Sequence, residues 1–146
     1  MLKKLIIRVL LVAAVLFIAI QFVPVDRSNP PVTGTVDAPV PVMHVLRTSC
    51  FDCHSNETHW PWYSYVAPVS WLVARDVREG REELNFSHWD RYDPQKRAKI
   101  AEESYEEVAE GKMPMWIYTA IHRDARVTDE ELALLREWAQ SMEGAH

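Results

Sequence analysis

The chain has 146 residues, two of them cysteine, and a formal net charge of −5. This length suits one domain, and the acidic balance excludes nucleic acid as a partner because its phosphates would repel the protein. Residues 1–23 carry three basic residues and no acidic one, so the remainder has 13 basic and 21 acidic residues and a net charge of −8. Such a body suits a partner protein with a basic docking face.

Residues 1–23 predict a transmembrane signal anchor. Residues 1–8 are basic, and an unbroken apolar run follows them. A helix over residues 5–23 would measure about 28 Å, close to the roughly 30 Å hydrocarbon layer of a bilayer. Residues 20–24 offer no small-x-small cleavage site, which favours an uncleaved anchor over a removed signal peptide. We therefore expect a single-pass protein of the bacterial inner membrane, with the rest of the chain in the periplasm.

Residues 24–40 are rich in proline and predict an extended linker. Proline fixes φ and removes a backbone donor, so such a segment favours an extended conformation over a folded element. The remaining residues, 41–146, form the predicted domain. Its first element is a short helix over residues 41–49, where Val42, Val45 and Leu46 recur at helical spacing.

The next five residues are Cys50-Phe51-Asp52-Cys53-His54, the pattern C-x-x-C-H of covalent c-type haem attachment. Two thiols at this spacing can form thioethers with the two vinyl groups of one haem. The histidine that follows can then bind the iron as its proximal ligand. The motif uses both cysteines of the chain and therefore predicts one covalent haem c.

Two other interpretations of the cysteine pair are less favoured. A thioredoxin-like redox centre requires a βαβ setting, and the sequence shows no alternating strand pattern. A structural zinc site requires four ligands at recurrent spacing. Only His44 and His59 could complete such a set, and their spacing is irregular.

The segment from 55 to 68 is an aromatic loop that contains Trp60, Trp62 and Tyr63. We expect these three rings to pack on the edge of the cofactor, although hydrophobic loop packing alone would also explain them.

Two helices follow the aromatic loop. An apolar stripe predicts a helix from Pro68 to about Glu83, and residues 84–92 are typical of a loop or short turn. Asp93 is a predicted N-cap of the next helix, which ends at Gly111. The outer face of this second helix is strongly acidic, which suits either plain solvation or docking of a partner.

Met113 is the predicted sixth ligand of the iron. It stands on a loop just after a helix and directly before Pro114, and thioether sulfur is soft enough to bind haem iron. Met115 is an alternative ligand, and His122 is another that would give a bis-histidine haem. The last helix begins with a capping box made by Thr128 and Glu131.

The segment from about Val42 to Ala139 resembles the class I cytochrome c-like proteins. Within them it is most similar to a bacterial branch of membrane-anchored or exported monohaem haem-binding domains. The likeness rests on Cys50-Phe51-Asp52-Cys53-His54-Ser55-Asn56, Trp60-Pro61-Trp62-Tyr63, Ala67-Pro68-Val69-Ser70-Trp71, Leu84-Asn85-Phe86-Ser87, Gly111-Lys112-Met113-Pro114, Tyr118, His122 and Trp138. It implies an all-α domain around one covalent haem, with its first and last helices crossed. It also implies a proximal histidine and a distal methionine, here His54 and Met113. Met115 replaces the second proline expected after Met113-Pro114.

These features predict a membrane-tethered monohaem c-type cytochrome that carries single electrons outside the cytoplasm. The sequence shows no acid–base pair typical of a substrate pocket, so we do not expect an enzyme. The alternatives are a peroxidase-like haem enzyme or a haem sensor with an exchangeable sixth ligand, and a structural haem subunit of a larger complex. The expected partners are the membrane, through the N-terminal anchor, and a redox protein.

Overall fold

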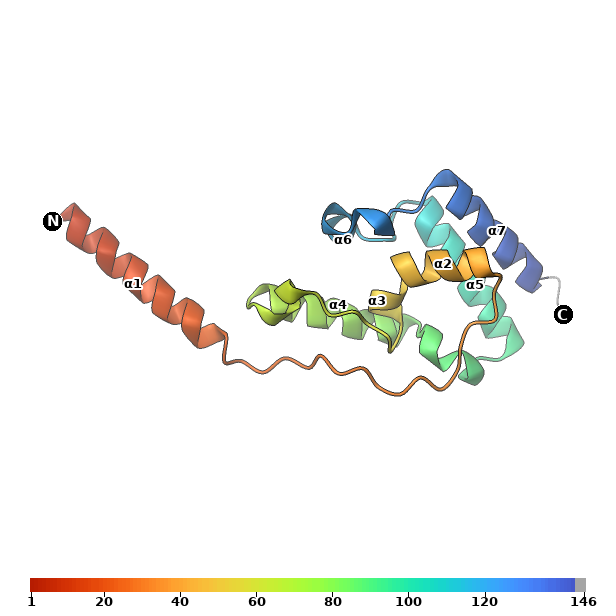
Figure 1. Cartoon of the computed structure of the whole chain (residues 1–146), viewed down its shortest axis with the longest axis horizontal. Coiled ribbons are helices and arrows are strands. Elements are labelled where there is room, and N and C mark those ends of the chain that lie inside the picture. Colours follow the sequence, from red (N-terminus) through yellow and green to blue (C-terminus); the bar gives the residue numbers. More distant parts are fainter. Residues whose placement is uncertain (144–146) are drawn as a thin grey trace. The chain divides into compact units, whose positions relative to one another are not determined.

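The computed structural model describes residues 1–143, and within this range the protein is entirely helical, as predicted (Figure 1). The α-helices are α1 (Leu2–Ile20), α2 (Val40–Ser49), α3 (Phe51–His54), α4 (Val69–Glu83), α5 (Pro94–Ala109), α6 (Trp116–Ile121) and α7 (Asp129–Glu143). Three short 3₁₀-helices join them: η1 (Trp62–Tyr65), η2 (Phe86–Arg91) and η3 (Arg123–Ala125). The predicted domain 41–146 reaches three residues beyond the described part.

The chain divides into two compact units. Unit 1 contains Met1–Ser28 and Trp60–Asp76, and unit 2 contains Asn29–His59 and the chain from Val77 onward. Helix α4 begins in unit 1 and ends in unit 2.

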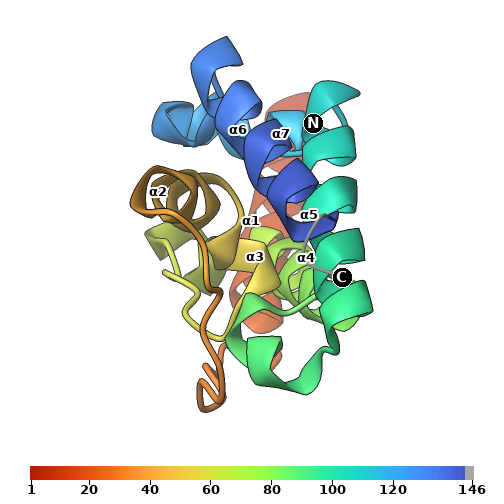
Figure 2. The same ribbon diagram turned by 90° about the vertical axis from the view of Figure 1, so that its right-hand side faces the viewer.

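The hydrophobic core lies in unit 2. Helices α5 and α7 pack along each other, and α2 packs against α7 (Figure 2). Phe51 stacks on Phe86 with ring centroids 5.4 Å apart, and Trp89 lies 6.2 Å from Trp138. All four rings are at most 4% exposed. The core therefore connects α3, which carries most of the C-x-x-C-H motif, to α7. Helix α7 also packs against α2.

The capped helix ends of unit 2 confirm the sequence predictions. The side chain of Asp93 accepts a hydrogen bond from the backbone N–H of Lys96 at 2.7 Å, as an N-cap does. The Thr128 N–H donates to Glu131 Oε2 at 2.8 Å, and the Glu131 N–H donates to Thr128 Oγ1 at 3.2 Å. This reciprocal pair is the predicted capping box. Helix α6, in contrast, was not predicted.

Helix α1 corrects the prediction for the N-terminal segment. Within residues 1–143, no helix has the length and apolar character needed to cross a membrane. The helix ends at Ile20 rather than Val23, and its first turns contain Lys3, Lys4 and Arg8. The uninterrupted apolar run is therefore limited to residues 9–20. Every residue of α1 except Ile20 is exposed.

The predicted linker is extended, but its second part is bound to unit 2. The backbone N–H groups of Thr33 and Gly34 both donate to the Ser87 carbonyl at 3.0 Å, and Val36 is buried in the core. A Cβ at Gly34 would lie 2.5 Å from the backbone nitrogen of Asp90, so only glycine allows this approach. The segment from residue 29 onward is thus part of the domain and not a free spacer.

Candidate functional site

The C-x-x-C-H motif spans the end of α2 and the whole of α3. Cys50 caps α3, and its carbonyl accepts from the N–H groups of Cys53 at 3.2 Å and His54 at 2.9 Å. Burial, with a smaller contribution from Cys53, raises the pKa of the Cys50 thiol to about 12. The thiol is therefore protonated at neutral pH. Cys50, Cys53 and His54 thus belong to a single helical turn, with Cys50 at its N-cap.

His54 is oriented by α4. Its Nδ1 lies 2.8 Å from the carbonyl oxygen of Gly80. A carbonyl only accepts, so Nδ1 carries the proton and donates, which leaves the lone pair on Nε2. Burial lowers the pKa of His54, although the hydrogen bond to Gly80 opposes this effect. The imidazole is therefore neutral at pH 7, the form that binds a metal.

Gly80 permits the close contact between α4 and α3. A Cβ at this position would lie 2.8 Å from the carbonyl oxygen of Cys53 and 3.1 Å from its carbonyl carbon. Real side chains do not tolerate such distances, so only glycine brings its own carbonyl within reach of His54. The predictions from the sequence did not include Gly80. The available signal was a glycine inside a well-patterned amphipathic helix, which often marks a packing or functional requirement.

The end of α5 delivers Met113. Gly111 adopts a φ of +71°, the left-handed conformation that commonly ends a helix. The chain then folds back, and the Glu107 carbonyl accepts from the N–H groups of Lys112 at 2.9 Å and Met113 at 3.0 Å. These bonds fix the backbone of Met113, whose side chain is 37% exposed.

A pocket of about 470 Å³ joins these elements, within the roughly 300–1,000 Å³ typical of cofactor sites. It lies wholly in unit 2. Its lining residues are Ser49, Cys50, His54, Glu83, Leu84, Phe86, Glu103, Ser104, Glu106, Glu107, Val108, Met113 and Pro114. Cys50 and His54 of the motif thus share one cavity with Met113, although more than fifty residues separate them in the sequence.

The other predicted site residues do not line this pocket. Trp60, Trp62 and Tyr63 belong to unit 1, and Trp62 is 78% exposed. Cys53 lies on α3 with its carbonyl against Gly80. Met115, an alternative predicted ligand, is the N-cap of α6.

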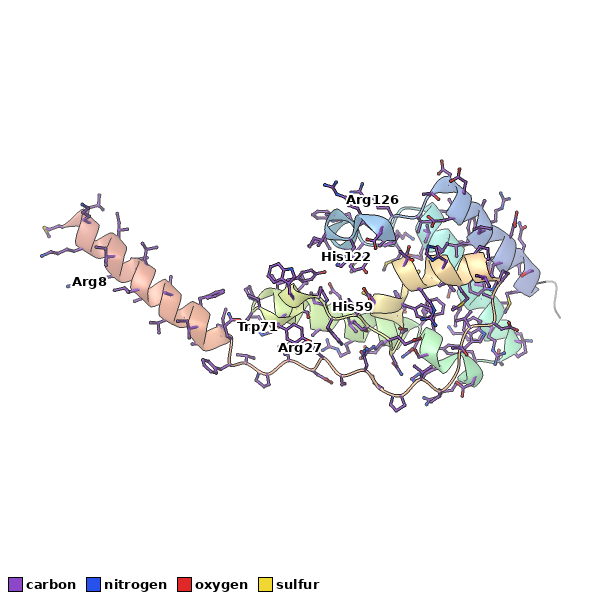
Figure 3. All side chains as sticks on the ribbon, viewed as in Figure 1. Arg8, Arg27, His59, Trp71, His122 and Arg126 are labelled. Carbon is purple, nitrogen blue, oxygen red and sulfur yellow. The ribbon has the colours of Figure 1, made fainter. Side chains whose placement is uncertain are left out.

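His122 belongs to a contact between α6 and the motif. It follows α6 (Figure 3), and its ring stacks on Tyr118 with centroids 4.4 Å apart. The Tyr118 hydroxyl donates to Asp52 Oδ2 at 2.7 Å, while Asp52 Oδ1 accepts from the His59 N–H at 2.8 Å. The contact ties the chain beyond Met113 to α3.

A buried polar network holds the chain after the motif. The Asn56 N–H donates to Ser87 Oγ at 2.9 Å, and Asn85 Nδ2 donates to Asn56 Oδ1 at 2.8 Å. Arg81 donates to the Ser55 carbonyl at 2.8 Å. These bonds connect the motif to η2 and α4. Among the described residues, no group of three His, Cys, Asp or Glu side chains is arranged to hold a metal ion.

The family model for the haem-binding domain matches residues 15–141. The chain belongs to this family. Comparison with curated proteins and with solved structures gave no match. The pocket of this haem-binding domain fits its cofactor: a neutral imidazole, a thiol and a thioether sulfur share one cavity with the apolar side chains of Leu84, Phe86 and Val108.

Proposed function

We propose that this haem-binding domain is a monohaem c-type cytochrome that carries single electrons and is not an enzyme. The observation that most supports this proposal is that Cys50, His54 and Met113 line the same pocket. When bound, haem supplies one-electron Fe(III)/Fe(II) chemistry, and its potential is set by axial ligands and burial. A carrier needs only a fixed ligand set and one accessible route for electrons.

Each residue has a defined task in this proposal. Cys50 and Cys53 hold the cofactor through thioethers. His54 would bind the iron through Nε2, and the Gly80 carbonyl on Nδ1 fixes the ring and would increase its basicity. Met113 would supply the second protein ligand, and the two hydrogen bonds to the Glu107 carbonyl position its backbone.

Met113 also favours a carrier over a haem enzyme or a sensor. An enzyme of the peroxidase type requires an open or exchangeable sixth position on the iron. Here the soft sulfur of Met113 lines the pocket. The backbone of Met113 is hydrogen-bonded to Glu107, near the C-terminal end of α5. A methionine with its backbone held in this way would not readily give up its place on the iron to a substrate.

Attachment of haem is tested by producing the full chain in a bacterial host that matures c-type cytochromes. We expect the haem to remain on the chain after denaturation and the intact mass to rise by one haem. In the Cys50→Ser, Cys53→Ser double variant the haem should be lost on denaturation. A colourless parent chain with both thiols open to alkylation would refute the proposal.

The distal ligand is tested with Met113→Ala and, as its matched control, Met115→Ala. The long-wavelength charge-transfer band of methionine-ligated ferric haem should disappear in Met113→Ala and persist in Met115→Ala. Cyanide should then bind rapidly to the first variant only. Loss of the band in Met115→Ala alone, or an unchanged spectrum in both, would assign the ligand to Met115 or to His122.

We further propose that the domain works outside the cytoplasm and passes electrons to a protein with a basic docking face. The basic start and apolar run of α1 are typical of export signals, and covalent attachment retains a cofactor where lost haem is not replaced. Fusing residues 1–40 to a reporter enzyme that is active only outside the cytoplasm tests the location. An inactive but stable fusion would contradict it.

A further inference from the structure

Unit 1 carries an exposed apolar face that the haem pocket does not use. It spans η1 and the first turns of α4, and we call it the Trp62–Leu72 face. Its members are Trp62, Tyr65, Val66, Val69, Trp71 and Leu72, which are between 36% and 78% exposed. Clustered exposed rings and aliphatic side chains mark an interaction surface on a soluble domain.

The Trp62–Leu72 face is hydrogen-bonded to the end of α1. The Ala67 N–H donates to Gln21 Oε1 at 2.9 Å, and Gln21 Nε2 donates to the Ala67 carbonyl at 3.2 Å. Ala67 lies between the two halves of the face and is only 3% exposed. The end of the exposed apolar helix is therefore bound next to the exposed apolar face within one unit.

Arg27 adds a second attachment. Its guanidinium lies 4.4 Å from the centroid of the Tyr65 ring and donates to the Ser64 carbonyl at 3.1 Å. Figure 3 shows Trp71 on α4 and Arg27 on the chain that follows α1. Two rings of the indole type, a phenol and an arginine are the residues that gather at the boundary between lipid and water.

Unit 1 has a positive net charge, which an anionic lipid surface attracts. Residues 1–28 and 60–76 contain five basic and two acidic residues, a net charge of +3, while the rest of the chain carries −8. An anionic lipid surface attracts the first and repels the second. Residues 1–28 supply this net charge, whereas residues 60–76, which carry the face, contain one basic and one acidic residue.

We propose that the Trp62–Leu72 face lies on the surface of a bilayer that contains anionic lipids, with its rings at the level of the headgroups. This contact would be made by unit 1 and does not depend on the haem chemistry. Helices with an apolar and a basic part bind to such interfaces in proportion to buried apolar area and opposite charge.

The test replaces a surface residue by a photocrosslinking amino acid in the full-length holoprotein. The variants are Trp62→p-benzoylphenylalanine, Leu72→p-benzoylphenylalanine and, as the control, Trp116→p-benzoylphenylalanine. Trp116 matches Trp62 because it is 79% exposed against 78%, but it belongs to unit 2. Each variant is irradiated on vesicles of phosphatidylethanolamine and phosphatidylglycerol, and the adducts are identified by mass spectrometry.

We expect lipid adducts from positions 62 and 72 at several times the yield from position 116. An unchanged Soret band in each variant shows that the haem domain is intact. Equal yields at all three positions, or none, would overturn the proposal. A crosslink between two copies of the chain at position 62 would instead assign the face to self-association and would also overturn it.

Discussion

A single methyl group at position 80 should disturb the proximal side of the site. In Gly80→Ala the new Cβ would meet the Cys53 carbonyl at 2.8 Å, so α4 must move away from α3. The hydrogen bond from His54 Nδ1 to the residue 80 carbonyl then lengthens, and in the proposed haem site the imidazole would become a weaker donor to iron. We expect a higher reduction potential, measured by spectroelectrochemistry, and a loss of about 1–3 kcal/mol in unfolding free energy. An unchanged potential would show that Gly80 does not tune His54.

Gly111→Ala provides a contrast, because its cost is conformational and not steric. No atom lies within 4 Å of a Cβ placed there, but the φ of +71° is unfavourable for alanine. The strain should cost about 1–2 kcal/mol and should act on the turn that carries Met113. We therefore expect the methionine charge-transfer band to weaken on mild heating. The hydrogen bond between His54 Nδ1 and the Gly80 carbonyl should stay intact. A variant as stable as the parent to urea would contradict this.

At the scale of the elements, a side-chain hydrogen bond from Tyr118 to Asp52 joins α6 to the motif. Tyr118→Phe removes the donor to Asp52 and leaves a carboxylate oxygen without that partner. Hydrogen bonds to charged groups contribute about 1.5–3 kcal/mol. Amide hydrogen exchange should therefore accelerate in α6, whereas the amides of α7 should keep their protection. Thr119→Ala is a control on the same helix, since the hydroxyl that it removes donates locally to the Trp116 carbonyl at 3.2 Å.

The elements that the sequence predicted well are those with local signals. Asp93 and Thr128 mark helix starts by capping chemistry, and Gly111 marks a helix end, so each could be recognised without tertiary knowledge. Helix α6 lacks such signals and is held by Tyr118 on Asp52. The attachment of residues 29–39 also depends on a distant partner, Ser87. The placement of Trp62 at the cofactor edge rested on aromatic composition and stays a prediction, since Trp62 belongs to unit 1 and the pocket to unit 2.

At the scale of the whole molecule, the pocket has an acidic border. Glu83, Glu103, Glu106 and Glu107 line it, and Lys112, paired with Glu107 and Glu110, compensates only part of this charge. A basic partner should therefore react faster with the holoprotein at low salt than at high salt. In Glu103→Lys, Glu106→Lys this dependence should weaken or reverse.

The matched control for this charge reversal is Glu130→Lys, Glu137→Lys on the exposed face of α7. It changes the net charge equally without touching the pocket lining. Stopped-flow electron exchange with a basic redox protein should respond to the first pair of substitutions several times more strongly. Equal effects of both pairs would mean that overall charge, and not the pocket border, governs the encounter.

The attachment of the chain to unit 2 from Asn29 onward limits how far the haem domain can travel. Only residues 21–28 separate α1 from Asn29, the first residue hydrogen-bonded to unit 2, and a chain of that length spans at most about 30 Å when fully extended. If α1 is held on lipid, an acceptor in the same membrane meets the domain as a confined neighbour. Its collisions are then set by lateral diffusion and a high local concentration, so dilution of the surrounding solution leaves the electron-transfer rate unchanged.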